Sequence, residues 1–220
     1  MYKSNSKSSN NKRNLDAVRK KFYVKYMVCL RDQLILKSIL NEQGVKCNIS
    51  PHGAIECFDD ITEVQINELK KRLRKSGLIL LNEKESMLID RIINTIVEFV
   101  HYSDSLPKLD FMDIISEHIV SDNESVLQIF SDVKGMSVLQ FIVTQKIERA
   151  KELMLYEDMA YDDIAELLNY KNRDYLTAQF KKTTGLTPAY FKRLKEERMK
   201  IAETYIREHR HDATGASSRN

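Results

Sequence analysis

The spacing of hydrophobic and polar positions along the chain changes near residue 84. Between residues 22 and 81, short β-branched and aromatic runs (FYVKYMV, VKCNIS, AIECF and LILL) alternate with two longer segments whose apolar residues recur at helical spacing. Those two segments, LRDQLILKSILNEQG and EVQINELKKRLRKSG, each end at a glycine, which is typical of a helix C-terminus. The order is β-α-β-β-α-β over about 60 residues, which predicts a ferredoxin-like domain.

Beyond residue 84 every apolar pattern has the period of a helix, from KESMLIDRIINTIVEFVHY to PAYFKRLKEERMKIAETYIREH. Two segments in between, ISEHIVSDNESVLQIFSDVKGMS and IAELLNYKNRDYLTAQFKKTTGLT, share the spacing of their apolar residues, with a drift of one residue in the turn. We therefore expect an α+β protein, in which a small ferredoxin-like βαββαβ domain precedes an all-α domain. The all-α domain would hold two helix-turn-helix units joined by a long helix, from Val138 to about Leu155.

This division gives four segments. Residues 1–21 are rich in Ser, Asn and Lys without a hydrophobic period, so we expect a disordered basic tail. Residues 22–83 form the ferredoxin-like domain and residues 84–200 form the double helix-turn-helix domain. Residues 201–220 hold the end of the last helix and a disordered tail.

The second helix-turn-helix unit has turn and cap residues at the required positions. Asn169 lies at the turn, where asparagine tolerates a left-handed backbone. Asn172 is a suitable N-cap for the next helix, and Gly185 ends it. Leu176 and Phe180, four residues apart, face the core. The sequence therefore predicts a helix with one anchored side and one free side.

The free side of that helix carries side chains suited to DNA. The residues that point away from the core near the helix N-terminus, where a recognition helix meets base edges, are Arg173, Asp174, Thr177 and Ala178. The lysines placed to reach backbone phosphates are Lys181, Lys182 and Lys192.

The segment ERAKELMLYEDMAYDDIAELLNYKNRDYLTAQFKKTTGLTPAYFKRL resembles the AraC/XylS family of bacterial transcription regulators. The family's DNA-binding domain holds two helix-turn-helix units joined by a long helix, which would cover residues 84–197 here. The resemblance implies a sequence-specific transcription regulator whose two units dock in successive major-groove faces of double-stranded DNA. It also implies a cytoplasmic protein with RNA polymerase as a candidate partner.

The two units differ in charge. Residues 160–200 hold nine Lys or Arg against six Asp or Glu, whereas residues 105–137 hold two against six. The first unit also has the β-branched Val120 at its turn, and Ser131 and Asp132 where the second unit has two lysines. Its candidate base-reading residues are Asn123, Glu124, Leu127 and Gln128. Either this unit reads bases without help from phosphate contacts, or it has drifted toward a protein contact.

The first strand-helix junction, YMVCLRD, resembles the loop of heavy-metal-associated domains of copper chaperones, which carry Met-x-Cys-x-x-Cys there. Cys29 matches the first ligand, but Asp32 stands at the second. A single thiolate is not a soft-metal site, so the resemblance suggests the fold and argues against metal transport. We expect no metal site and no cofactor.

A second cysteine pair lies in the hairpin. If the turn closes symmetrically, Cys47 faces Cys57 across the strands. The pair is either a redox or soft-metal pair or, as the commoner case, two buried thiols that act as small hydrophobes.

Composition excludes several classes of protein. Hydrophobic residues make up 42% of the 220 residues, enough for a packed core, and the net charge of +3 alone does not indicate nucleic acid. No apolar run reaches the roughly 18 residues of a membrane span, and three cysteines fit a reducing cytosol. No catalytic constellation is evident, so we expect no enzyme.

Three functions follow from the sequence. The first is a DNA-binding regulator whose N-terminal domain senses a small effector, self-associates or docks a partner. The second is a degenerate regulator that acts as a protein-interaction module. The third is a metal-responsive regulator, which Asp32 disfavours.

Overall fold

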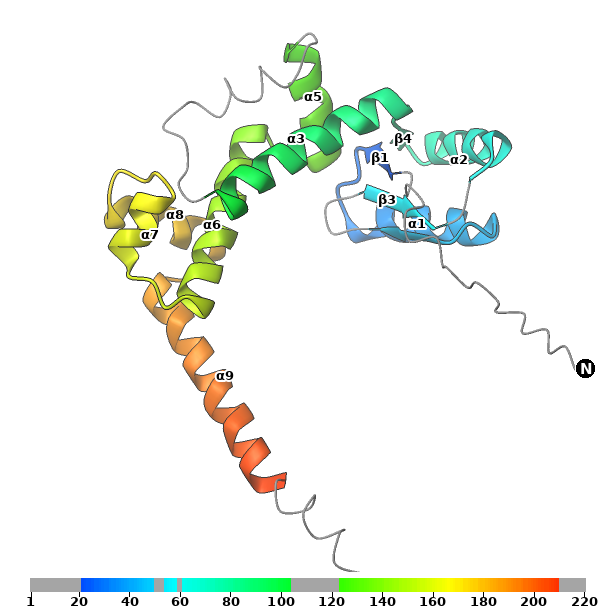
Figure 1. Cartoon of the computed structure of the whole chain (residues 1–220). Helices are drawn as coiled ribbons and strands as arrows, with labels where there is room; N and C mark the ends of the chain where they lie inside the picture. The colour runs from blue at the N-terminus through cyan, green and yellow to red at the C-terminus, as the bar shows by residue number, and fades with distance from the viewer. Residues whose placement is uncertain (1–20, 50–53, 59–60, 104–122, 210–220) are drawn as a thin grey trace, which may run out of the picture. The chain divides into compact units, whose positions relative to one another are not determined.

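The computed structural model describes residues 21–49, 54–58, 61–103 and 123–209, with the side chains of all but Asn123 and Glu124. These residues form two compact units, which divide between Met87 and Leu88, with residues 133–135 grouped with the first (Figure 1). The division falls inside one helix, α3 (Glu83–Tyr102).

The first unit has the β-α-β-β-α-β order that the sequence predicts. Its elements are β1 (Lys21–Lys25), α1 (Leu30–Glu42), β2 (Cys47–Ile49), β3 (Ala54–Cys57), α2 (Glu63–Lys75) and β4 (Ile79–Leu80). The strands form one sheet in the order β2-β3-β1-β4, and every neighbouring pair is antiparallel. The chain therefore does not pair β1 with β2 but inserts β3 between them.

The core of this unit lies between the sheet and its two helices. The buried strand residues in it are Phe22, Val24, Ile55, Cys57 and Leu80. The buried helix residues that pack with them are Leu36, Ile39, Leu40, Leu69 and Leu73, whose spacing of three or four places them on one side of each helix. Each fully buried leucine contributes about 1.5–3 kcal/mol relative to exposure.

The first strand is shorter than the sequence predicts. The β-branched and aromatic run suggests a strand through Val28, but β1 ends at Lys25. Tyr26 has φ of 68°, in the left-handed region, which an extended strand cannot contain. The next residues therefore form the loop into α1, and Val28 is 83% exposed.

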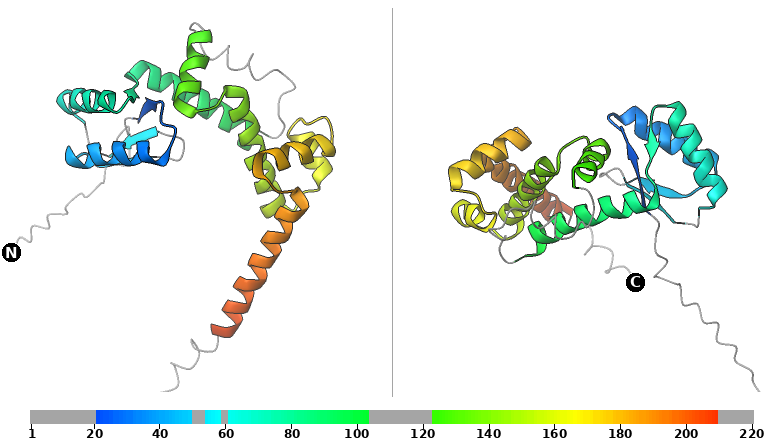
Figure 2. Two further views of the ribbon diagram at one scale, coloured as in Figure 1. Left: turned by 180° about the vertical axis from the view of Figure 1, so that it is seen from behind. Right: turned by 90° about the horizontal axis from the view of Figure 1, so that it is seen from above.

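The second unit is helical (Figure 2). Its elements beyond α3 are α5 (Asn123–Lys134), α6 (Val138–Tyr156), α7 (Tyr161–Leu167), α8 (Arg173–Thr184) and α9 (Pro188–His209). The long linking helix expected from Val138 is confirmed as α6, which Ser137 caps by accepting a hydrogen bond from the Gln140 amide at 3.2 Å. The first helix expected in the first helix-turn-helix unit, and its turn at Val120, lie outside the described residues.

The part of the internal repeat that lies in the described residues shows matching phenylalanine contacts. Phe130 on α5 meets Phe141 on α6 edge to face, with ring centres 5.6 Å apart, and Phe180 on α8 meets Phe191 on α9 in the same manner at 5.6 Å. Both pairs are eleven residues apart in sequence. The helix of each unit therefore joins the helix that follows it through the same aromatic contact.

Among the described helices, none is by itself long and apolar enough to cross a membrane. One pair bent by 53°, residues 125–134 of α5 with α6, satisfies the same test of length and composition.

Candidate DNA-binding site

The turn between α7 and α8 forms through local hydrogen bonds. Asn169 has φ of 53°, which confirms the left-handed turn residue expected from the sequence. The Tyr170 amide then donates to the Ala165 carbonyl at 2.8 Å. The Asn172 side chain caps α8 by accepting hydrogen bonds from the amides of Asp174 and Tyr175, both at 3.1 Å. The start of α8 is thus fixed by the residues that precede it.

One side of α8 is anchored, as predicted. Leu176 is 1% exposed and Phe180 is fully buried. Ala165 of α7 is also buried at 2%, and its small side chain allows the two helices to lie close together. Gly185, with φ of 78°, ends α8 in the left-handed conformation that favours glycine.

The turn also packs against α6. The Lys146 ammonium lies 5.4 Å from the centre of the Tyr170 ring. Burial raises the pKa of Tyr170 to about 12 and lowers the pKa of Lys146. The long helix therefore supports the turn that orients α8.

The exposed part of α8 presents two rows of side chains, and the row that begins at Arg173 lies beside the anchored side. Residues four apart lie one above another on a helix. One row holds Arg173, Thr177 and Lys181, and the adjoining row holds Asp174, Ala178 and Lys182. All six are exposed except Thr177, which is half-buried. The structure thus brings together the second-unit residues expected on α8, and each row ends in a lysine.

Arg173 has an aromatic partner that the sequence analysis did not identify. Its guanidinium lies over the ring of Tyr161, the first residue of α7, with the central carbon 5.3 Å from the ring centre. A guanidinium is attracted to the face of an aromatic ring. Arg173 is therefore held at the edge of the exposed face where α7 and α8 begin.

Lys192 is engaged in an ion pair. Its Nζ lies 2.5 Å from Oδ1 of Asp158, which belongs to the loop between α6 and α7. The hydrogen bond from Lys192 holds the pKa of Asp158 below its usual value, and the same bond raises the pKa of Lys192. A phosphate would have to displace this carboxylate, so Lys192 differs from Lys181 and Lys182.

Replacing Asp158 with asparagine tests this competition. Asp158 has φ of 48°, a conformation that asparagine also tolerates, so the loop is expected to keep its shape. The variant frees the Lys192 ammonium, and we expect tighter binding to duplex DNA of any sequence, with a salt slope steeper by about one unit. Fluorescence anisotropy at several salt concentrations measures both.

The matched control is the same change in a Lys192→Ala background, where the gain should vanish. A gain that persists without Lys192 would show that Asp158 acts by its own negative charge instead.

The first helix-turn-helix unit is described only through α5. Leu127 is half-buried, and the exposed Gln128 donates a hydrogen bond from Nε2 to Asp132 at 2.9 Å. The side chains of Asn123 and Glu124 lie outside the described structure. Burial lowers the pKa of Lys134, at the end of α5, to about 8.

The loop that resembles a heavy-metal-associated domain has a structural use. Asp32 accepts hydrogen bonds from the amides of Val28 at 2.9 Å and Cys29 at 3.0 Å, and so caps α1. These amides hold the pKa of Asp32 below its usual value. Within the parts of the chain that the structure describes, no three His, Cys, Asp or Glu side chains come together as metal ligands.

The helical region is similar in sequence to known proteins. A family model described as a helix-turn-helix domain matches residues 122–194, which include α5 to α8 and the start of α9. The Arabinose operon regulatory protein of Escherichia coli K12 is 27% identical over 156 residues, which are 64% of this chain and 53% of that protein. The helical region contains a helix-turn-helix domain. The rows of α8 belong to this domain.

Two further proteins are similar to the helical region. The Bifunctional transcriptional activator/DNA repair enzyme AdaA of Bacillus subtilis strain 168 is 28% identical over 120 residues, which are 47% of this chain and 55% of AdaA. The solved DNA-binding domain of AdpA, a global transcriptional factor in complex with a target DNA, gives a TM-score of 0.43 at 18% identity, over 50% of this chain and 94% of that one. The chain spans about half the length of the two curated relatives it matches here.

Proposed function

We propose that the chain is a sequence-specific, double-stranded DNA-binding transcription regulator of the AraC type, without enzymatic activity. The observation that carries the proposal is the exposed face of α8. Its N-terminus is capped by Asn172, its inner side is anchored by Phe180, and both of its outward rows end in lysine. A rigid helix with a polar outer face that is basic at one end fits the major groove.

In this proposal the residues of α8 contact bases or phosphates according to their position on the helix. Arg173, Asp174, Thr177 and Ala178 read base edges. Lys181 and Lys182, one turn or more further along the helix, contact backbone phosphates, and Lys192 adds a third contact once Asp158 is displaced. The second unit is then both the anchor and the main reader.

The first unit has a smaller role in the proposal. Asn123, Glu124, Leu127 and Gln128 are its candidate base contacts. A carboxylate accepts a hydrogen bond from a cytosine amino group but repels phosphate, so this unit adds specificity without much affinity.

The N-terminal residues 22–83 form a ferredoxin-like domain in the proposal. The strand order β2-β3-β1-β4, antiparallel throughout, supports this assignment because it is the split βαβ arrangement. The domain would sense a small effector, self-associate or dock a partner such as RNA polymerase. A regulator of this type works on DNA in the bacterial cytoplasm.

Salt dependence tests the phosphate contacts. Affinity for duplex DNA, measured by fluorescence anisotropy, should fall linearly with salt on logarithmic axes. Lys181→Ala should weaken all sequences about equally and flatten the slope by about one unit. The control is Lys75→Ala, which removes the same charge from the end of α2.

Two results would oppose the proposal. Binding that is absent, or that ignores salt, would favour the protein-interaction module instead. Equal losses from Lys181→Ala and Lys75→Ala would show that binding depends on overall charge and not on α8.

A further inference from the structure

The hairpin of the first unit brings two cysteines directly opposite each other. Cys47 on β2 pairs with Cys57 on β3. The next pairs along the two strands are Asn48 with Glu56 and Ile49 with Ile55. The symmetric register expected from the sequence is thereby confirmed. The three cysteines of the described chain are all reduced, and the third, Cys29, lies exposed at the start of α1.

The hydrogen bonds of the hairpin show which kind of pair this is. The Phe58 amide donates to the Lys46 carbonyl at 3.0 Å, so Lys46 and Phe58 are a hydrogen-bonded pair. Pair types alternate along an antiparallel ladder, and Cys47 and Cys57 are therefore a non-hydrogen-bonded pair. Cα atoms in such pairs lie about 4.5 Å apart, and a disulfide requires about 4.4–6.8 Å. The backbone is thus already within bonding range.

Both thiols lie on the side of the sheet that faces the helices. Cys57 is 3% exposed and belongs to the core, and Cys47 packs against that core from the edge strand. Because the two side chains share one face of adjacent strands, a bond between them needs no reversal of either strand.

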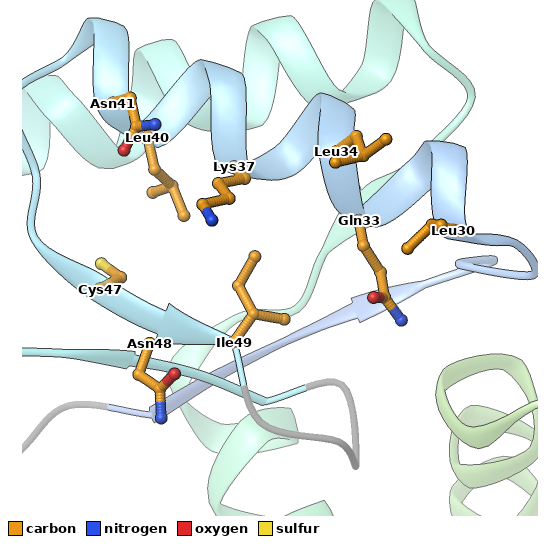
Figure 3. Close-up of a pocket in the computed structure, with 9 residues that line it drawn as sticks. All are labelled: Leu30, Gln33, Leu34, Lys37, Leu40, Asn41, Cys47, Asn48 and Ile49. Atoms are coloured by element: carbon orange, nitrogen blue, oxygen red, sulfur yellow. The ribbon is translucent and has the colours of Figure 1, made fainter.

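Only one of the two sulfurs is open to solvent. Cys47 is half-buried and lines a pocket of about 330 Å³ between α1 and β2. Figure 3 shows the Lys37 side chain directed from α1 into the same pocket. A small oxidant can therefore reach Cys47, while Cys57 is buried in the core with only 3% of its surface exposed.

We propose that Cys47 and Cys57 are a reversible thiol switch that hydrogen peroxide closes into an intramolecular disulfide. The Cys47 thiolate attacks one peroxide oxygen, the O–O bond breaks, and hydroxide leaves and takes up a proton, which gives a sulfenic acid and water. Cys57 then loses its proton and attacks the Cys47 sulfur, the S–O bond breaks, and a second water leaves. Two thiols are oxidised to one disulfide, and peroxide is reduced to two waters.

The bond would act mainly at the edge of the sheet. The two cysteines enclose a short loop, so closing it removes less entropy from the unfolded chain than closing a long loop would. The disulfide instead ties the three-residue edge strand β2 to β3 beside the pocket. Oxidation thus makes this edge rigid, whether or not the chain binds DNA.

The sequence provides a direct assay in the full chain. No lysine or arginine lies between Cys47 and Lys70, so trypsin leaves both cysteines in one peptide and releases Cys29 in another. After peroxide treatment and alkylation, most of the peptide Cys47–Lys70 should carry no alkyl group. Its mass should be about 2 Da, two hydrogens, below that of the same peptide with two free thiols. Dithiothreitol should restore alkylation at both positions.

Matched variants separate this result from general oxidation. In Cys57→Ser the peptide should show no loss of 2 Da, and Cys47 should carry a sulfenic acid that dimedone traps. The proposal is overturned if both cysteines of the wild type remain alkylated, if Cys47 goes to sulfinic acid without the loss of mass, or if its disulfides join two chains.

Discussion

Replacing Phe180 with alanine is expected to lower the free energy of unfolding of the helical region by about 3–5 kcal/mol, because a fully buried phenylalanine leaves a cavity. The ring also loses its edge-to-face contact with Phe191. Since these contacts seat α8 on its neighbours, DNA binding should fall with stability. Urea unfolding followed by circular dichroism measures the effect.

Tyr175→Ala is the matched control for this experiment. It also removes an aromatic ring from α8, but Tyr175 is 56% exposed, and a surface change of this kind typically alters stability by about 0.5 kcal/mol or less. Similar losses from the two variants would show that Phe180 is not the anchor of α8.

Replacing Arg173 with alanine should relax the preference for one base position. An arginine that bonds guanine through two donors contributes about 1–3 kcal/mol of discrimination. Non-specific binding should change little, because Lys181 and Lys182 are retained. Binding-site selection on the wild type and the variant measures the base preference. Fluorescence anisotropy with random duplex measures the non-specific affinity.

Two further variants show how Arg173 acts. Arg173→Lys keeps the charge but loses the paired donors, so it should relax the same position. Tyr161→Leu removes the ring that holds the guanidinium, and should weaken the preference less than Arg173→Ala does. If Arg173→Ala leaves the selected sequence unchanged while Glu124→Ala abolishes it, the acidic first unit is the reader.

Local chemistry explains why much of the helix-turn-helix could be predicted from the sequence. Asn169, Asn172 and Gly185 each act within a few residues of their own position, through a left-handed turn, a side-chain cap and a glycine stop. The same holds for Leu176 and Phe180, whose spacing on one helix fixes which side is buried. Such features are visible before any tertiary contact is known.

The contacts that were missed join residues far apart in the sequence or oppose a local preference. Asp158 meets Lys192 across 34 positions, and Tyr161 meets Arg173 only because α7 and α8 begin near each other. Tyr26 breaks a run that favours a strand by residue type. In each case the contact or the turn depends on how the backbone folds, which hydrophobic pattern and residue propensity do not reveal.

The matched phenylalanine pairs have a consequence for how such a regulator acquires new targets. Phe130 with Phe141 and Phe180 with Phe191 join the helices of each unit by the same contact. The side chains that differ between the units take no part in this contact, and Ser131 with Asp132 in one unit corresponds to Lys181 with Lys182 in the other. In the proposed regulator, mutations can change the outward side chains of one unit while the other unit still binds DNA.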